Sequence, residues 1–192
     1  MPISIDRGPT LVAVVAAVFL ILAGAPGYPQ SSVTENAAIR QFQSAADDYA
    51  FLHRRLQRGL GPREITASSE SVQIAMDAMA TVIRAARPEA RPGDLFTPAV
   101  QVALRARVAK ALRANAYTSA DVYDREAPLK VNGSLPRTGA KPVLPCILEA
   151  LPRLPEELEY RIVGSDLVLI DVHAGLIVEI LPLPASSRPS RP

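Results

Sequence analysis

The first two thirds of the chain repeat apolar residues at intervals of three and four, which is the spacing of an amphipathic helix. Three such stretches predict helices over about 33–60, over about 68–87, and from Thr97-Pro98 onward, all within a helical region that spans 26–115. None of them is apolar all round, so each should bury one face against a neighbour. The pattern therefore predicts a small antiparallel bundle of about three helices.

Towards the C-terminus the pattern changes to short runs rich in β-branched residues. The runs 158–163, 166–172 and 176–181 are separated by short turns that contain glycine. This arrangement predicts a three-stranded antiparallel β-meander within 158–182. The expected fold class is therefore α+β: an N-terminal bundle of about three amphipathic helices followed by a small C-terminal three-stranded antiparallel β-meander.

A proline-rich connection over 116–157 joins the two regions. Within it, 129–135 contains an Asn-Gly pair that favours a β-hairpin, and 145–151 is long enough for two helical turns. The last residues, 183–192, are rich in proline, serine and arginine, a composition typical of a disordered tail.

An unbroken apolar run from Leu11 to Leu22 precedes the small residues Ala23-Gly24-Ala25. This order is typical of a secretory signal peptide, here residues 1–25, cleaved after Ala25. The run is shorter than the roughly 20 apolar residues that span a bilayer. The sequence therefore predicts a periplasmic or secreted protein. The alternative is an uncleaved inner-membrane anchor over residues 10–25, which would be the only contact with a membrane.

Composition adds limits to this picture. Apolar residues make up 48% of the 192, but aromatics only 5%, so the core should be built from alanine, valine, leucine and isoleucine. A single cysteine, Cys146, excludes an internal disulfide and is expected to act as a small buried hydrophobe. The net charge is only +2, and the tyrosines are not interleaved with basic residues. Together with export, this argues against nucleic-acid binding.

The chain contains no sequence motif of a serine hydrolase, a nucleotide-binding loop, a zinc protease or a CxxC pair. It therefore predicts no catalytic residue, no cofactor-binding residue and no cofactor. The only candidates for metal ligation are His53 on the first helix and Asp171, His173 and Glu179 in the meander. A buried polar residue on an apolar strand needs a partner, and Arg161 is the expected partner of Asp171 or Glu179.

The block LPRLPEELEYRIVGSDLVLIDVHAGLIVEILP, with KVNGSLP and PCILEALP before it and GDLFTPAV farther upstream, covers much of the chain. It resembles a family of exported hypothetical proteins of soil bacteria that end in a similar LPxLPxxLxYRxVGxxLxLxDVHAxLIV stretch. The resemblance implies export but no activity and no functional residues.

These patterns favour a non-enzymatic binding or interaction protein whose partner is an unknown protein or envelope component. Two alternatives remain open: a periplasmic hydrolase that uses the region of Asp171, His173 and Glu179, or a metal-handling protein that uses the two histidines with carboxylates. Both alternatives require His53, His173 and a carboxylate to lie within ligand distance of one another.

Overall fold

The computed structural model describes residues 30–61, 68–117, 129–136 and 139–183. The described residues from Ser31 onward belong to one compact unit. The predicted signal peptide and most of the predicted tail lie outside the described residues. In the part of the chain that is described, no helix is both long and apolar enough to cross a membrane.

The helices form where the three-and-four spacing predicts them. They are α1 (Gln30–Gly59), α2 (Ser69–Ala86), α3 (Pro98–Ala114) and the short α4 (Pro145–Ala150). Ser68 caps α2, because its side-chain oxygen accepts a hydrogen bond from the backbone N–H of Ser71. Pro98 occupies the first turn of α3, where its missing N–H has no intrahelical partner to lose.

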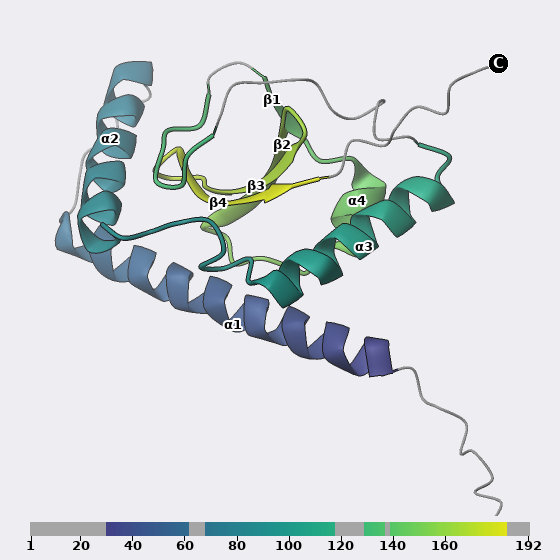
Figure 1. Ribbon diagram of the computed structural model, residues 1–192. Helices are drawn as coiled ribbons and strands as arrows, with labels where there is room; N and C mark the ends of the chain where they lie inside the picture. The colour runs from purple at the N-terminus through teal and green to yellow at the C-terminus, as the bar shows by residue number, and fades with distance from the viewer. Residues whose placement is uncertain (1–29, 62–67, 118–128, 137–138, 184–192) are drawn as a thin grey trace, which may run out of the picture. The chain divides into compact units, whose positions relative to one another are not determined.

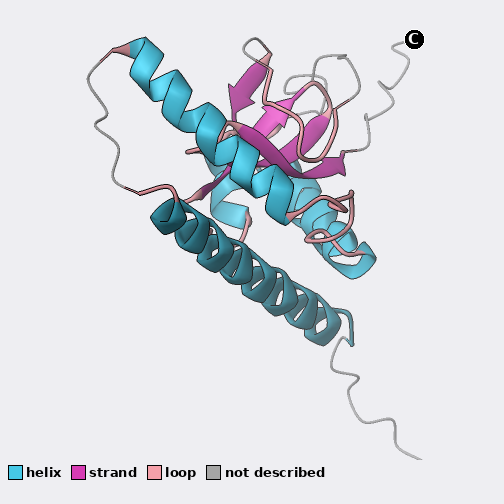
Figure 2. Cartoon of the chain, turned by 90° about the vertical axis from the view of Figure 1, so that its left-hand side faces the viewer, coloured by secondary structure: helices cyan, strands magenta, loops and turns pink. Residues whose placement is uncertain are grey.

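The strands form one antiparallel sheet in the order β1-β2-β3-β4, which Figure 2 shows as a single layer. They are β1 (Ala140–Pro142), β2 (Leu158–Val163), β3 (Asp166–Asp171) and β4 (Leu176–Pro182). The predicted α+β class, with helices first and antiparallel strands last, is confirmed. The sheet has four strands and not three, because β1 adds an edge strand of three residues that is too short to show a period of two.

The two faces of the sheet are covered by different parts of the chain. On one face, strand side chains share a buried cluster with residues of α1, α3 and α4, including Phe42, Leu104, Ile147, Tyr160 and Leu169. Figure 1 shows α1 and α3 on the same side of the strands. The helical stripes are thus buried against the sheet as well as against one another. α2 contributes to a smaller cluster with the end of α1 and the start of β4.

The other face is covered by the segment 129–136, which is not the predicted hairpin. Its backbone pairs with the start of β4: Asn132 N–H donates to the Ile177 carbonyl, and Ile177 N–H donates to the Gly133 carbonyl. Asn132 takes a positive φ of 60°, but Gly133 does not take the second positive φ that a type I′ turn needs. The backbone groups of this segment therefore pair with the edge strand β4 and do not form the predicted hairpin.

Candidate functional site

Asp171 is the centre of a buried polar cluster that joins α1 to the turn after β3. It ends β3 on the face that packs against α1, where it is completely buried. Its Oδ1 accepts the backbone N–H groups of His173 and Ala174, at 3.0 and 2.9 Å. Its Oδ2 accepts the Tyr49 hydroxyl at 2.9 Å and lies 2.6 Å from Nδ1 of His53. Four donors therefore compensate the loss of hydration that burial imposes on the carboxylate.

His53 reaches this carboxylate from α1, where it lies one helical turn after Tyr49. Both side chains are buried. Because a carboxylate can only accept, the proton between the two groups belongs to Nδ1 of the imidazole. In the neutral ring Nε2 then carries the lone pair. That nitrogen is buried and has no hydrogen-bond partner among the described residues. A buried polar atom without a partner is uncommon and calls for an explanation.

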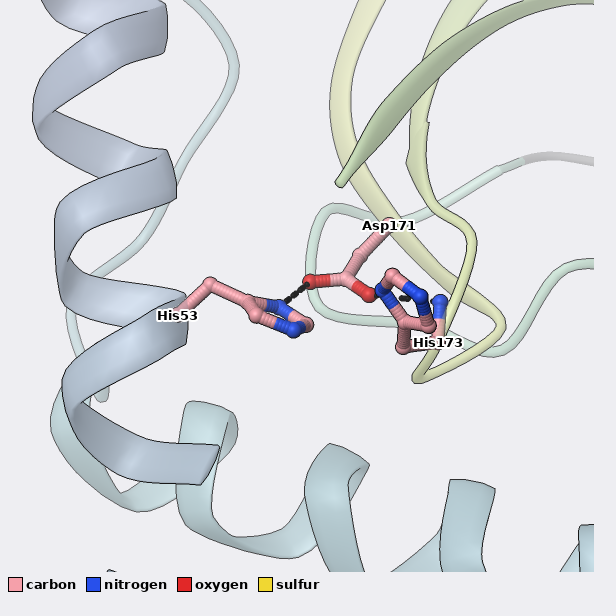
Figure 3. Close-up of side chains that lie close together, drawn as sticks. All are labelled: His53, Asp171 and His173. Carbon is pink, nitrogen blue, oxygen red and sulfur yellow. Dashed lines mark hydrogen bonds and ion pairs between the residues drawn. The ribbon is translucent and has the colours of Figure 1, made fainter. Parts of the chain in front are cut away.

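His173 completes the cluster from the turn between β3 and β4. Its ring lies 5.2 Å from the ring of His53, measured between centroids, and its side chain is exposed. Figure 3 shows the two imidazoles on either side of the Asp171 carboxylate. One ligand atom from each of the three residues can be chosen so that all lie within 4.8 Å of one another. The structure thus brings together three of the four residues that the sequence analysis gives as candidates for metal ligation.

The turn that carries His173 is held in place by backbone geometry. Gly175 N–H donates to the Asp171 carbonyl at 2.9 Å, and Gly175 itself has a φ of +60°. That conformation costs any residue with a β-carbon roughly 1–2 kcal/mol. Val172 N–H donates to the carbonyl of Glu157, which ties the turn to the start of β2. The turn is therefore pinned at both sides while the His173 side chain remains accessible.

Glu179, the fourth nominated residue, belongs to a different structure. It is fully buried on β4, and its carboxylate accepts backbone N–H groups from Gly93, Leu95, Phe96 and Ile180 at 2.9 to 3.1 Å. These bonds anchor the loop that leads into α3. Because its carboxylate is hydrogen-bonded to this backbone, Glu179 has a structural role and is not part of the candidate site.

The expected pairing of Arg161 with Asp171 or Glu179 is wrong. Arg161 pairs with Glu159 at 3.0 Å, two residues away on the same strand. Side chains alternate along a strand, and Arg161 lies opposite Val168, on the face away from α1. Asp171 and Glu179 lie on the other face, so the arginine cannot reach them.

Two further residues extend the cluster and were not nominated from the sequence. Tyr49 donates to Asp171, and the guanidinium carbon of Arg87 lies 5.1 Å from the centre of the Tyr49 ring. Tyr49 was visible as part of the apolar stripe, and its four-residue spacing from His53 places both on one helix face. Cys146, in contrast, lies on α4, is partly exposed and packs against the main core cluster.

Burial raises the pKa of the Tyr49 phenol far above its usual value, and the neighbouring Asp171 charge raises it further, against a smaller opposing effect of Arg87. Burial also raises the pKa of Tyr160. Both phenols are therefore neutral in the folded protein at neutral and moderately alkaline pH. Tyr49 acts here as a hydroxyl donor to Asp171 and not as a charged group.

These shifts predict how stability depends on alkaline pH. A raised folded pKa means that the stabilisation is present below the unfolded pKa of about 10 and is lost as pH rises above it. We expect the free energy of unfolding, measured with urea, to fall between pH 9 and pH 11. Absorbance at 295 nm should show about two fewer tyrosinates at pH 11 in the folded than in the unfolded protein. Identical titration of both states would contradict the burial of Tyr49 and Tyr160.

The cluster can serve as a small ligand site, with one imidazole held rigidly and the other accessible. The geometry is that of a candidate metal centre, or of an imidazole base oriented by a carboxylate. No protein family, curated protein or solved structure matches the chain.

Proposed function

We propose that the protein is an exported, non-enzymatic binding protein for a divalent transition-metal ion, held by His53 and His173. The observation that supports this proposal is the buried Nε2 of His53, which has no partner in the part of the chain that the structure describes, although Nδ1 of the same ring is held by Asp171. Histidines that ligate metals almost always donate their other ring N–H to a carboxylate, a backbone carbonyl or water. A metal ion would give the unpartnered nitrogen its missing partner.

The roles of the three residues follow from their other contacts. Both oxygens of Asp171 are already occupied by four donors. The carboxylate therefore orients the His53 ring, and direct ligation is left to the two imidazoles. Ligands on a tetrahedral zinc ion lie about 3.4 Å apart, given zinc–nitrogen bonds of about 2.05 Å. One ring nitrogen of each imidazole lies within 4.8 Å of the other, and bringing the two ligating nitrogens to the tetrahedral distance on one ion requires a side-chain movement. The exposed side chain of His173 is the part that can make it.

The donor set favours a particular class of metal. Imidazole nitrogen suits zinc, copper and nickel, whereas magnesium and calcium require several oxygen ligands. Two imidazoles fill only part of a four-coordinate sphere, which leaves positions for water or another ligand. Such a partly open site at an accessible turn favours an exchangeable ion over a permanently enclosed one.

A second candidate function rests on the same His53–Asp171 pair. A carboxylate that holds Nδ1 leaves Nε2 able to accept a proton, as in a general base of a hydrolase. Glu179 does not contribute to this hydrolase candidate, because its carboxylate is hydrogen-bonded to the backbone of the loop before α3. Hydrolysis of a generic ester by the metal-free protein, lost in His53→Gln, would favour this candidate.

The proposal predicts selective stabilisation by Zn²⁺. At a free concentration of 100 times Kd, one bound ion raises the free energy of unfolding by about 2.7 kcal/mol. We expect this rise with Zn²⁺ and not with Mg²⁺, measured by urea unfolding and by isothermal titration. Replacing the exposed His173 with alanine should leave the fold intact and weaken zinc binding at least tenfold.

Asp47→Asn is the matched control, because Asp47 is an exposed carboxylate on α1 outside the cluster. It should bind zinc as tightly as the unchanged protein. Equal zinc affinity in His173→Ala, or an equal response to Zn²⁺ and Mg²⁺, would overturn the proposal.

A further inference from the structure

A surface cleft of about 710 Å³ lies between α2, the segment Ser134–Pro136 and the sheet face that carries Arg161. Its volume is within the range of about 300–1,000 Å³ that is usual for small-molecule sites. None of His53, Asp171 and His173 lines it, although Ala174 and Gly175 from the same turn do. The cleft is therefore distinct from the candidate metal site.

On one side of the cleft, side-chain hydrogen bonds fix α2 to the segment that carries Ser134. From α2, Arg84 donates through Nε to the Asn132 carbonyl at 3.0 Å and through Nη2 to the Ser134 hydroxyl at 3.1 Å. Asn132 in turn donates through its side-chain amide to the Arg87 carbonyl at 2.7 Å. This side of the cleft is thus preformed, so ligand binding would not lose free energy in ordering α2 against the segment that carries Ser134.

The lining combines apolar residues with two opposite charges. Ile170, Ala80 and Ala174 are the buried apolar residues of this lining. Asp77 stands on the α2 wall, where, among the described residues, one carboxylate oxygen accepts a hydrogen bond from a neutral amide donor, Gln73 Nε2, at 2.9 Å. Arg161 stands on the β2 wall, where Glu159 engages one of its terminal nitrogens. A guanidinium has five N–H donors, so most of its donor capacity remains for a ligand.

We propose that this cleft binds a small zwitterion, an apolar α-amino acid or a short peptide. The ammonium group would face Asp77, the carboxylate would face Arg161, and the apolar side chain would lie over Ile170. Charge-assisted hydrogen bonds to both ends supply the recognition. A ligand of high net charge is disfavoured, because each of the two charged walls would attract one sign and repel the other. This function goes beyond metal binding and rests on different residues.

The test uses the full chain without its predicted signal peptide and four probes: L-leucine, the dipeptide Ala-Leu, N-acetyl-leucine and leucine amide. Isothermal titration should show binding of leucine or Ala-Leu, whereas the acetyl and amide forms, which lose one charge each, should bind at least tenfold more weakly. Asp77→Asn and Arg161→Gln should each weaken binding of the zwitterion at least tenfold. Asp48→Asn and Arg153→Gln, at exposed positions outside the cleft, are the matched controls.

Zinc titration of the same variants keeps this proposal separate from the metal site, since Asp77→Asn and Arg161→Gln should leave zinc affinity unchanged. The proposal is overturned if neither zwitterion binds at concentrations up to about 10 mM. It is also overturned if N-acetyl-leucine and leucine amide bind as well as leucine, or if binding survives in both cleft variants.

Discussion

Replacing Glu179 with alanine is expected to lower the free energy of unfolding by about 3–5 kcal/mol. The substitution leaves the backbone N–H groups of Gly93, Leu95 and Phe96 without their acceptor in a buried setting. Each buried donor left unpaired costs roughly 1–3 kcal/mol, and partial hydration of the loosened loop recovers some of that cost. Urea unfolding followed by circular dichroism measures the change.

Glu159→Ala is the control for this prediction. Glu159 is also a strand glutamate, but its side chain is 43% exposed and forms a surface ion pair with Arg161. A surface ion pair contributes about 0–1 kcal/mol, so the control should unfold almost as the unchanged protein does. If Glu179→Ala were no less stable than Glu159→Ala, the proposed anchoring of the loop before α3 would be wrong.

A comparable loss of about 3–5 kcal/mol is expected for Asp171→Ala. The alanine removes the acceptor of four donors: the Tyr49 hydroxyl, the His53 ring N–H, and the backbone N–H groups of His173 and Ala174. These donors come from both α1 and the β3–β4 turn, so the helix and the sheet lose a shared attachment. Values this large arise from broken buried networks and not from surface changes.

Asp171→Asn separates the structural role of this residue from its role in metal binding. The asparagine oxygen can still accept the two backbone N–H groups, so the stability loss should be smaller than for alanine. Its amide group, however, would face Nδ1 of His53 as a donor, which favours the tautomer that carries the proton on Nε2. Nε2 would then be unavailable as a ligand. We expect zinc affinity to fall by about 10–100-fold, the usual effect of losing such a supporting carboxylate. Unchanged affinity would contradict the assigned tautomer.

Most of the fold could be predicted from the sequence, because each long element has a strong period. The stripe of α3 is an example: Val100, Leu104 and Val108 are all buried, as their spacing requires. The structure departs from the sequence-based prediction where the backbone partner of a segment lies far away in the sequence. The segment 129–136 carries the turn residues of a hairpin, yet its backbone hydrogen bonds go to β4. Local turn chemistry cannot show that a distant strand edge is available.

The candidate site could be predicted only in part, and for the same reason. Asp171 and His173 are neighbours in the sequence, and His53 was a candidate because histidine is rare in this chain. Their convergence depends on α1 crossing the end of β3, which joins positions 118 residues apart. Glu179 was a candidate site residue in the sequence, but in the structure its carboxylate binds backbone N–H groups and is not part of the cluster. Its partners are backbone N–H groups, which every residue except proline possesses and no sequence pattern identifies.

Zinc-edge X-ray absorption of the zinc-loaded protein tests the central claim most directly. Metal bound by His53 and His173 should show two imidazole ligands at about 2.0–2.1 Å, light oxygen ligands in the remaining positions and no sulfur. The imidazole signal should fall by half in His173→Ala. A spectrum without imidazole ligands, or with a sulfur ligand from Cys146 at about 2.3 Å, would contradict the assignment of this cluster as the metal site.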